Sequence, residues 1–202
     1  MFDNVTKSIR VLSAGSVEKA NSGHPGMPLG MADVGTVLYK NFLKVSNDCP
    51  SWINRDRFVL SAGHGSALLY SLLHFNGFDI SIDDMKNFRQ LKSKTPGHPE
   101  LDTKLGIDIT TGPLGQGFAT GVGLALAESY LSKTFGDKII NHFTYGIVSD
   151  GDLMEGLSQE AAELAALWGL GKLIYIFDDN NISIDGNAVS YTHLRAHETL
   201  LY

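Results

Sequence analysis

Residues 147–186, IVSDGDLMEGLSQEAAELAALWGLGKLIYIFDDNNISIDG, hold the pattern that decides the fold. Two nearly continuous apolar runs, at 143–148 and 173–177, are rich in aromatic and β-branched residues, as is typical of strands buried on both faces. Between them, apolar residues recur at the i, i+3, i+4, i+7 spacing of a helix: Ala161, Leu164, Ala165 and Trp168. This order predicts a βαβ unit, and therefore an α/β fold with a parallel β-sheet flanked by helices.

Polar residues follow each of the two expected strands. Asp150 comes directly after the first, and Asn180 comes just after the second. Ligands of open parallel sheets bind beyond the carboxyl ends of the strands, where these two side chains should meet. A carboxylate beside an amide oxygen suits a hard divalent cation such as Mg²⁺, so the sequence predicts a metal-held phosphate site at this edge.

The rest of the chain adds predicted helices and one more strand around this unit. A strand is expected over 57–61, and a loop over 92–109. Helices are expected over 3–21, 29–42, 81–91 and 118–135, with another after residue 66. Three of the intervening loops carry a histidine among Gly and Pro residues: His24, His64 and His98. His64 would stand at a strand-to-helix junction, where a helix N-terminus attracts anions.

Composition narrows the class of protein. The chain has 202 residues, of which 43% are hydrophobic, enough for one domain with a full core. A net charge of -6 argues against nucleic acid or an anionic membrane as the main partner. Cys49 is the only cysteine, which excludes an internal disulfide and favours a reducing compartment. With no apolar leader or long apolar run, we expect a soluble cytoplasmic protein.

The glycine-rich segment 112–117, GPLGQG, has several possible functions. It matches neither the Walker A loop of nucleotide-binding proteins nor the G-x-G-x-x-G loop of dinucleotide folds. Taken alone it is as consistent with a structural turn as with a phosphate loop. A lone histidine in a Gly/Pro loop is likewise more often a local hydrogen-bonding group than a catalyst, and His74 and His142 keep that interpretation.

Five short motifs in order resemble those of one family. They are Ser22-Gly-His-Pro-Gly26, Ala62-Gly-His-Gly65, Thr95-Pro-Gly-His-Pro-Glu100, Gly112-Pro-Leu-Gly-Gln-Gly117 and Asp150-Gly-Asp-Leu-Met-Glu-Gly156. Together with Asn180, 30 positions after Asp150, they resemble the N-terminal, thiamine diphosphate-binding domain of transketolase. The resemblance covers residues 3–187, with Ser149 in place of the usual first glycine of the metal motif. The resemblance implies the thiamine diphosphate-binding fold, in which this part of the chain is the diphosphate-binding domain.

The resemblance implies a metal and diphosphate site. Asp150, Asn180 and the main-chain carbonyl of Ile182 match the family's ligands for Mg²⁺, Ca²⁺ or Mn²⁺. Gly151 would let a main-chain N–H approach the diphosphate of thiamine diphosphate. His64 matches a histidine that hydrogen-bonds the same group.

The other matched residues would surround the rings and the substrate. Gly112, Pro113 and Leu114 resemble the loop that lines the aminopyrimidine. Glu155 resembles a glutamate near that ring and the subunit interface. His24 and His98 resemble histidines that face the thiazolium C2 and the hydroxyls of the donor sugar, so that all three loop histidines belong to the implied catalytic set.

The implied reaction is transfer of a two-carbon ketol unit from a ketose phosphate to an aldose phosphate, as in the pentose phosphate pathway. The family completes its site with a pyrimidine-binding domain of the second subunit of a homodimer. Because 202 residues hold no such domain, we expect the chain alone to be inactive. Three alternatives stay open: the cofactor-binding subunit of a split transketolase, a thiamine diphosphate-binding module without turnover, and a related dihydroxyacetone synthase.

The last stretch, 188–202, does not match the family pattern. We expect residues 1–187 to form the incomplete diphosphate-binding domain, and residues 188–202 to be a tail outside the family pattern, as a segment of foreign origin would be. His193 and His197 in this tail would share one face of a helix. Without a metalloprotease motif beside them, a zinc pair is much less favoured than a surface tail.

Overall fold

The computed structural model describes residues 2–180, 182–183 and 186–187. The expected tail, with His193 and His197, lies outside the described residues, as does Asn181. The helices are α1 (Phe2–Ala20), α2 (Gly26–Gly30), α3 (Ala32–Asn41), α4 (Ser66–Phe75), α5 (Ile82–Lys86), α6 (Gln116–Phe135), α7 (Asp150–Met154) and α8 (Gly156–Leu167), with 3₁₀ turns at Gly63–Gly65 and Thr103–Leu105. The strands are β1 (Arg57–Leu60), β2 (Thr144–Ser149), β3 (Leu173–Asp178), β4 (Ile182–Ser183) and β5 (Gly186–Asn187).

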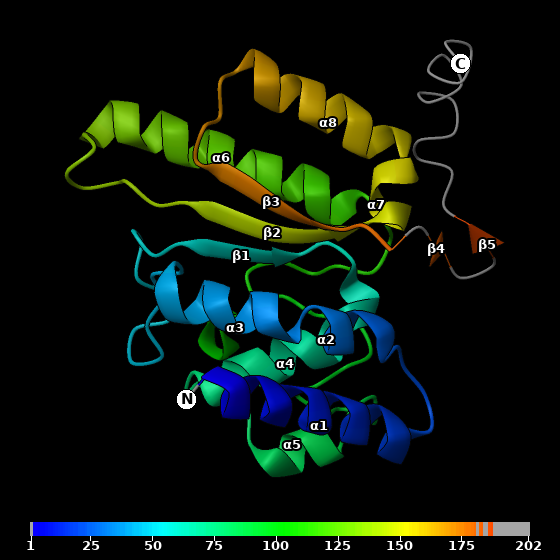
Figure 1. The fold of residues 1–202 in the computed structure, drawn as a ribbon. Coiled ribbons are helices and arrows are strands. Elements are labelled where there is room, and N and C mark those ends of the chain that lie inside the picture. The colour runs from blue at the N-terminus through cyan, green and yellow to red at the C-terminus, as the bar shows by residue number, and fades with distance from the viewer. Residues whose placement is uncertain (1, 181, 184–185, 188–202) are drawn as a thin grey trace.

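The main sheet has the order β1-β2-β3, and all its pairs are parallel. Helices α6 and α8 cover one face, and α1, α3 and α4 lie on the other (Figure 1). The α/β fold with a parallel sheet flanked by helices is therefore confirmed. Because all three strands run in the same direction, their carboxyl ends lie at one edge of the sheet. The last residues of the strands, Leu60, Ser149 and Asp178, lie at this edge.

Tyr175 fixes α6 against the sheet. Its ring lies across two glycines, because a Cβ at Gly146 would be 2.1 Å from Cε1 of Tyr175 and one at Gly121 would be 2.0 Å from its hydroxyl oxygen. That hydroxyl donates a hydrogen bond of 2.7 Å to the carbonyl of Phe118. The close approach sets the N-terminus of α6, and with it the glycine-rich loop, beside the ends of β1 and β2.

Two helix predictions need correction. The helix expected over 29–42 begins earlier, at Gly26, and is interrupted at Met31, so that it forms α2 and α3. Pro28 does not prevent this, because it lies in the first turn, where main-chain N–H groups have no partner within the helix. The helix expected over 81–91 is only α5, which ends at Lys86.

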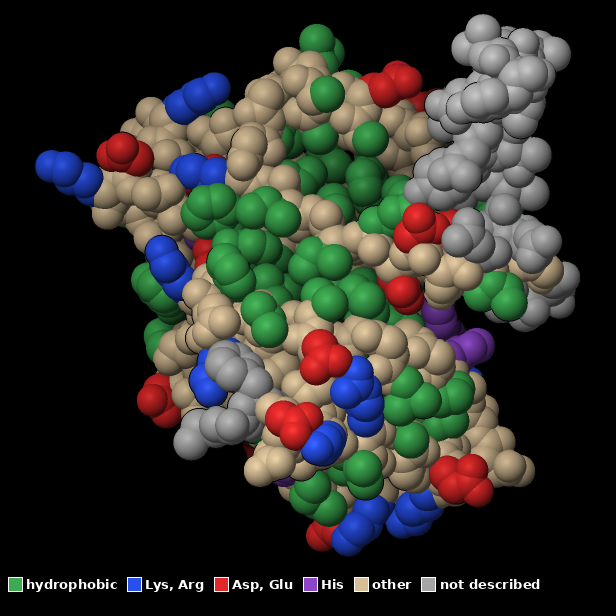
Figure 2. Space-filling view, in the orientation of Figure 1, with side chains coloured by type: hydrophobic (Ala, Val, Ile, Leu, Met, Phe, Trp, Pro, Cys, Tyr) green, Lys and Arg blue, Asp and Glu red, His purple; other side chains and the backbone are tan. Residues whose placement is uncertain are grey.

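The apolar runs 143–148 and 173–177 were both expected to form strands buried on both faces. This expectation holds for β2 and is wrong for β3. Every residue of β2 is buried, whereas β3 is partly exposed and Ile174 is 39% exposed. Among the described residues, β3 pairs with β2 alone and is an edge strand. Beside it, Val34, Val37, Leu38, Phe42 and Ile176 line an apolar groove of about 300 Å³, and Figure 2 shows hydrophobic side chains gathered across this face.

Candidate functional site

A cleft of about 390 Å³ opens at the carboxyl edge of the sheet. The loop between α1 and α2 forms one wall, and the residues after β2 and β3 form the other. The cleft brings together six residues singled out in the sequence: His24, His64, Leu114, Gly151, Asn180 and Ile182. The remaining singled-out residues, His98, Gly112, Pro113, Asp150 and Glu155, are not part of its lining.

The three expected metal ligands are joined by main-chain hydrogen bonds. Asp150 is fully buried at the start of α7, and its Oδ2 accepts the N–H of Asn180 at 3.1 Å. The side-chain oxygen of Asn180 in turn accepts the N–H of Ile182 at 3.0 Å. The set offers carboxylate, amide and carbonyl oxygens, which are the ligands that a hard divalent cation prefers.

Asp178 adds a carboxyl group to the lining of the cleft. Burial raises the pKa of Asp178, and the nearby charges of Asp150 and Asp179 raise it further. Repulsion among these carboxylates would be relieved by a bound cation. Within the described ranges, no group of three or more His, Cys, Asp or Glu side chains is arranged to hold a metal, so phosphate oxygens and water would complete the coordination.

The rings of His64 and His24 pack against each other in the lining of the cleft. The 3₁₀ turn Gly63–Gly65 carries His64 to the point where α4 begins, and its ring centroid lies 5.0 Å from that of His24 in an edge-to-face arrangement. Burial lowers the pKa of His64, and the neighbouring His24 lowers it further. A neutral imidazole carries one N–H donor and one acceptor, which suits a group that hydrogen-bonds an anionic ligand.

The loop before His98 is held by hydroxyl groups of α4. Ser66 donates to the carbonyl of Gly97 at 2.8 Å, and Tyr70 donates to the carbonyl of Pro96 at 2.9 Å. The His98 ring packs on the glycine-rich loop, since a Cβ at Gly112 would lie 3.4 Å from its Cγ. Burial lowers the pKa of His98, followed by the charge of Arg89 and the neighbouring His24.

Glu155 packs against the glycine-rich loop. Gly115 has φ +79° at the start of α6, and a Cβ there would be 2.9 Å from Cβ of Glu155. Glu155 is exposed. Leu114 lies next to Gly151, since a Cβ at Gly151 would be 3.0 Å from its Cδ1. These contacts place the loop beside the end of β2, while the roles expected for its residues stay predictions.

Sequence reasoning missed Asp152, which lies behind the cleft. It is fully buried and accepts hydrogen bonds from Ser61, Gly115 and Ser149. The available signal was the pair Ser149 and Asp152, spaced three apart before a helix, which is the pattern of a capping box. Asp178 was also visible in the sequence as the last residue of a strand, although it was not included among the candidate ligands.

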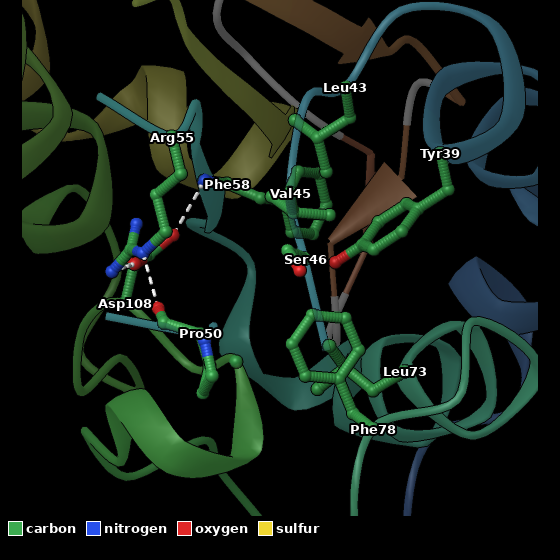
Figure 3. A pocket seen from close by; sticks show the side chains of 11 residues that line it. Tyr39, Leu43, Val45, Ser46, Pro50, Arg55, Phe58, Leu73, Phe78 and Asp108 are labelled. Carbon is green, nitrogen blue, oxygen red and sulfur yellow. Dashed lines mark hydrogen bonds and ion pairs between the residues drawn. The ribbon is translucent and has the colours of Figure 1, made fainter. Parts of the chain in front are cut away.

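A second cavity, shown in Figure 3, lies near the other end of β1 and has a volume of only about 10 Å³. Arg55 and Asp108 form a buried ion pair there, with 2.6 Å between guanidinium nitrogen and carboxylate oxygen. The Nε of Arg55 also donates to the carbonyl of Pro50 at 2.6 Å, and Asp108 accepts the N–H of Phe58 at 2.8 Å. A space of about one water molecule holds no substrate, so this cluster anchors β1 to the surrounding loops.

None of the helices in the described part of the chain is both long enough and apolar enough to cross a membrane.

The family model described as "Transketolase, thiamine diphosphate binding domain" matches residues 2–197, which runs past the boundary expected near 187, and that boundary stays a prediction. A transketolase of Bacillus subtilis (strain 168) is 58% identical over 183 residues, covering 89% of this chain and 27% of the relative.

Two solved structures are also similar. A transketolase from Campylobacter jejuni has a TM-score of 0.90 at 50% identity, covering 98% of this chain and 32% of that one. A Pichia stipitis transketolase, solved as a complex with sedoheptulose-7-phosphate, has a TM-score of 0.88 at 48% identity, covering 92% of this chain and 28% of that one. The chain thus spans between a quarter and a third of the length of the relatives it matches.

Proposed function

Because this chain belongs to the family of transketolase thiamine diphosphate-binding domains, we propose that it supplies the metal and diphosphate half of a ketol-transfer site. The observation that carries the proposal is the hydrogen-bonded set Asp150, Asn180 and Ile182, of which Asn180 and Ile182 line a cleft that also holds His24 and His64. This set would bind Mg²⁺, Ca²⁺ or Mn²⁺ and, through the cation, the diphosphate.

Residues around the cleft would have separate tasks. His64 would donate a hydrogen bond to the diphosphate, and the main chain at Gly151 would approach it closely. The loop of Gly112, Pro113 and Leu114 would lie along the aminopyrimidine, near Glu155. When bound, thiamine diphosphate supplies the electron sink for cleaving a carbon–carbon bond.

His24 and His98 would bind and orient the sugar phosphate. Both rings lie on loops fixed by proline and glycine, and each can donate or accept a hydrogen bond to a sugar hydroxyl. Because its pKa is lowered, His98 would be mainly neutral near pH 7 and able to accept a proton from such a hydroxyl. The reaction we propose is two-carbon ketol transfer from a ketose phosphate to an aldose phosphate, as in the pentose phosphate pathway.

The chain alone would be inactive. We propose that the site is completed by a pyrimidine-binding domain of a second subunit, in a cytoplasmic homodimer of the longer protein. The cofactor-binding subunit of a split transketolase, a binding module without turnover and a dihydroxyacetone synthase remain alternatives. The split subunit would gain activity from a separate partner chain, whereas the binding module would not. The synthase would differ in the acceptor aldehyde that it uses.

A ketol-transfer assay with a ketose phosphate donor and an aldose phosphate acceptor tests the proposal. The chain is assayed with thiamine diphosphate and Mg²⁺, first alone and then with a separately produced pyrimidine-binding domain. We expect no turnover alone and measurable transfer in the mixture. Cofactor binding without transfer in the mixture would favour the binding module.

A further inference from the structure

Asp152 is a buried carboxylate shared by three segments of the candidate site. Its Oδ1 accepts the hydroxyl of Ser61 at 2.8 Å and the main-chain N–H of Gly115 at 3.0 Å. Its Oδ2 accepts the N–H of Ser149 at 3.0 Å and the hydroxyl of the same residue at 3.2 Å. A carboxylate offers about four acceptor positions, so these four neutral donors use its capacity.

Each donor belongs to a segment that leads into the site. Ser61 follows β1 and comes three residues before His64. Gly115 ends the glycine-rich loop and starts α6. Ser149 ends β2 directly before Asp150. One side chain therefore sets the spacing between the His64 turn, the glycine-rich loop and the metal-ligand position.

The segments around Asp152 are packed too closely to shift toward its side chain. The hydroxyl of Ser158 donates to the main-chain carbonyl of Asp152 at 2.6 Å, which fixes α7 against α8. A Cβ at Gly115 would be 3.0 Å from that same hydroxyl oxygen, and one at Gly117 would be only 2.5 Å from Cα of Ser61. Because backbone segments meet this closely, the loop has no room to move toward Asp152, and the hydrogen bond from Gly115 to Asp152 opposes movement away from it.

We propose that Asp152 is a positioning residue for the cofactor, holding the glycine-rich loop and the His64 turn at fixed distances from Asp150. The inference rests on the proposed function, because the affinity that it controls is that for thiamine diphosphate. A cofactor that contacts the loop at one end and the metal at the other binds best when this distance is already set. Asp152 itself does not line the cleft and touches no reacting atom.

Asp152→Asn tests this with almost no change in shape. The amide keeps one acceptor oxygen and puts an NH₂ group in place of the other. The hydroxyls of Ser61 and Ser149 can rotate and accept from that group, but the main-chain N–H groups of Gly115 and Ser149 cannot. Whichever way the amide points, one of these two N–H groups loses its partner.

Asp56→Asn is the matched control, because Asp56 is also buried and accepts two main-chain N–H groups, from Lys44 at 2.8 Å and from Phe143 at 2.7 Å, at the opposite end of β1 from Ser61. Amide hydrogen exchange is followed by NMR in the 202-residue chain, and thiamine diphosphate is titrated calorimetrically in excess Mg²⁺. In Asp152→Asn we expect exchange at Gly115 or Ser149 to rise at least about tenfold, and cofactor affinity to fall about tenfold. Exchange in the core of α4 should not change, and Asp56→Asn should shift cofactor affinity less than about threefold.

Unchanged exchange and affinity in Asp152→Asn would overturn the proposal, and so would a uniform rise at all amides, which indicates general destabilisation only. If the wild-type chain binds no thiamine diphosphate, the proposed function fails, and exchange at Gly115 and Ser149 alone then decides whether Asp152 fixes the loop. If Asp152→Asn does not fold, the scalar coupling across the hydrogen bond from Gly115 N to Asp152 Cγ is measured in the wild type. Its persistence with cofactor present supports the proposal, and its loss contradicts it.

Discussion

The main-chain N–H of Asn180 donates a hydrogen bond to Oδ2 of Asp150 over 3.1 Å. This bond joins the segments that follow two neighbouring parallel strands, at positions 30 residues apart in the sequence. It connects a buried carboxylate to Asn180, which lines the cleft. The predictions below follow from this arrangement and from the packing that supports it.

Asn180→Ala should weaken Mg²⁺-dependent binding of thiamine diphosphate by at least about tenfold, because it removes one expected oxygen ligand. Asp179→Asn is the control, since Asp179 is an exposed neighbour that is not among the expected ligands. It should change the affinity less than about threefold, mainly through the loss of one charge. Calorimetric titrations of both variants are compared, and equal losses of affinity would show that charge alone matters.

Gly117→Ala should destabilise the fold by about 1–3 kcal/mol, because the new methyl group would lie 2.5 Å from Cα of Ser61. Gly123 lies on the same helix with nothing within 4 Å of a Cβ position, so Gly123→Ala should stabilise by about 1 kcal/mol through helix propensity. Urea unfolding of the two variants measures this difference. If both substitutions changed the free energy of unfolding in the same direction, the packing of α6 on β1 would be contradicted.

Asp108→Ala should lower the free energy of unfolding by about 3–5 kcal/mol, because it leaves the guanidinium of Arg55 buried without its ion pair. The ion pair of Arg10 with Asp33 is more exposed, so Asp33→Ala is the matched control and should leave the unfolding midpoint nearly unchanged. Chemical denaturation followed by circular dichroism compares them. A small effect of Asp108→Ala would mean that the Figure 3 cluster does not anchor β1.

Stability should fall as the pH is lowered from about 6.5 to 4. Burial, followed by the charge of Arg57, lowers the pKa of His142 to about 4, whereas the unfolded ring takes up its proton near pH 6.5. The unfolded state therefore binds more protons in this window, which costs roughly 3 kcal/mol of stability by its lower end. His64 and His98, whose pKa values are also lowered, act in the same direction.

His142→Gln removes the largest of these contributions. Unfolding free energies measured at pH 7 and pH 4.5 should differ clearly less in this variant than in the wild type. The difference should not vanish, because His64 and His98 still titrate. An identical pH dependence in both proteins would refute the assignment of a lowered pKa to His142.

The sequence predicted the parallel sheet and the positions of its strand ends well, for a physical reason. Runs such as 143–148 are apolar enough to form only buried strands, and the first polar residue after each run marks the strand end. The exposure of β3 could not be predicted, because burial depends on which neighbours lie beside the strand. The start of the second helix was predicted too late because Pro28 was taken to exclude a helix. A proline is tolerated in the first turn of a helix, where Pro28 lies.

The role of Asp152 was beyond reach of local patterns. Its donors Ser61 and Gly115 lie 91 and 37 positions away in the sequence, and only the folded chain brings them to one carboxylate. The same holds for the pairing of His24 with His64, whose 5.0 Å ring separation depends on how the α1–α2 loop packs against the end of β1. Spacing identifies the elements, whereas long-range packing decides which side chains share a site.

The most direct test of the central claim, that this cleft holds thiamine diphosphate through a divalent cation on Asp150, is calorimetric titration of the chain with the cofactor. Wild type is titrated in Mg²⁺ and again in excess EDTA, and Asp150→Ala is titrated in Mg²⁺. We predict saturable binding for the wild type in Mg²⁺ and its loss in the other two samples. Binding of equal affinity in EDTA or in Asp150→Ala would contradict the claim.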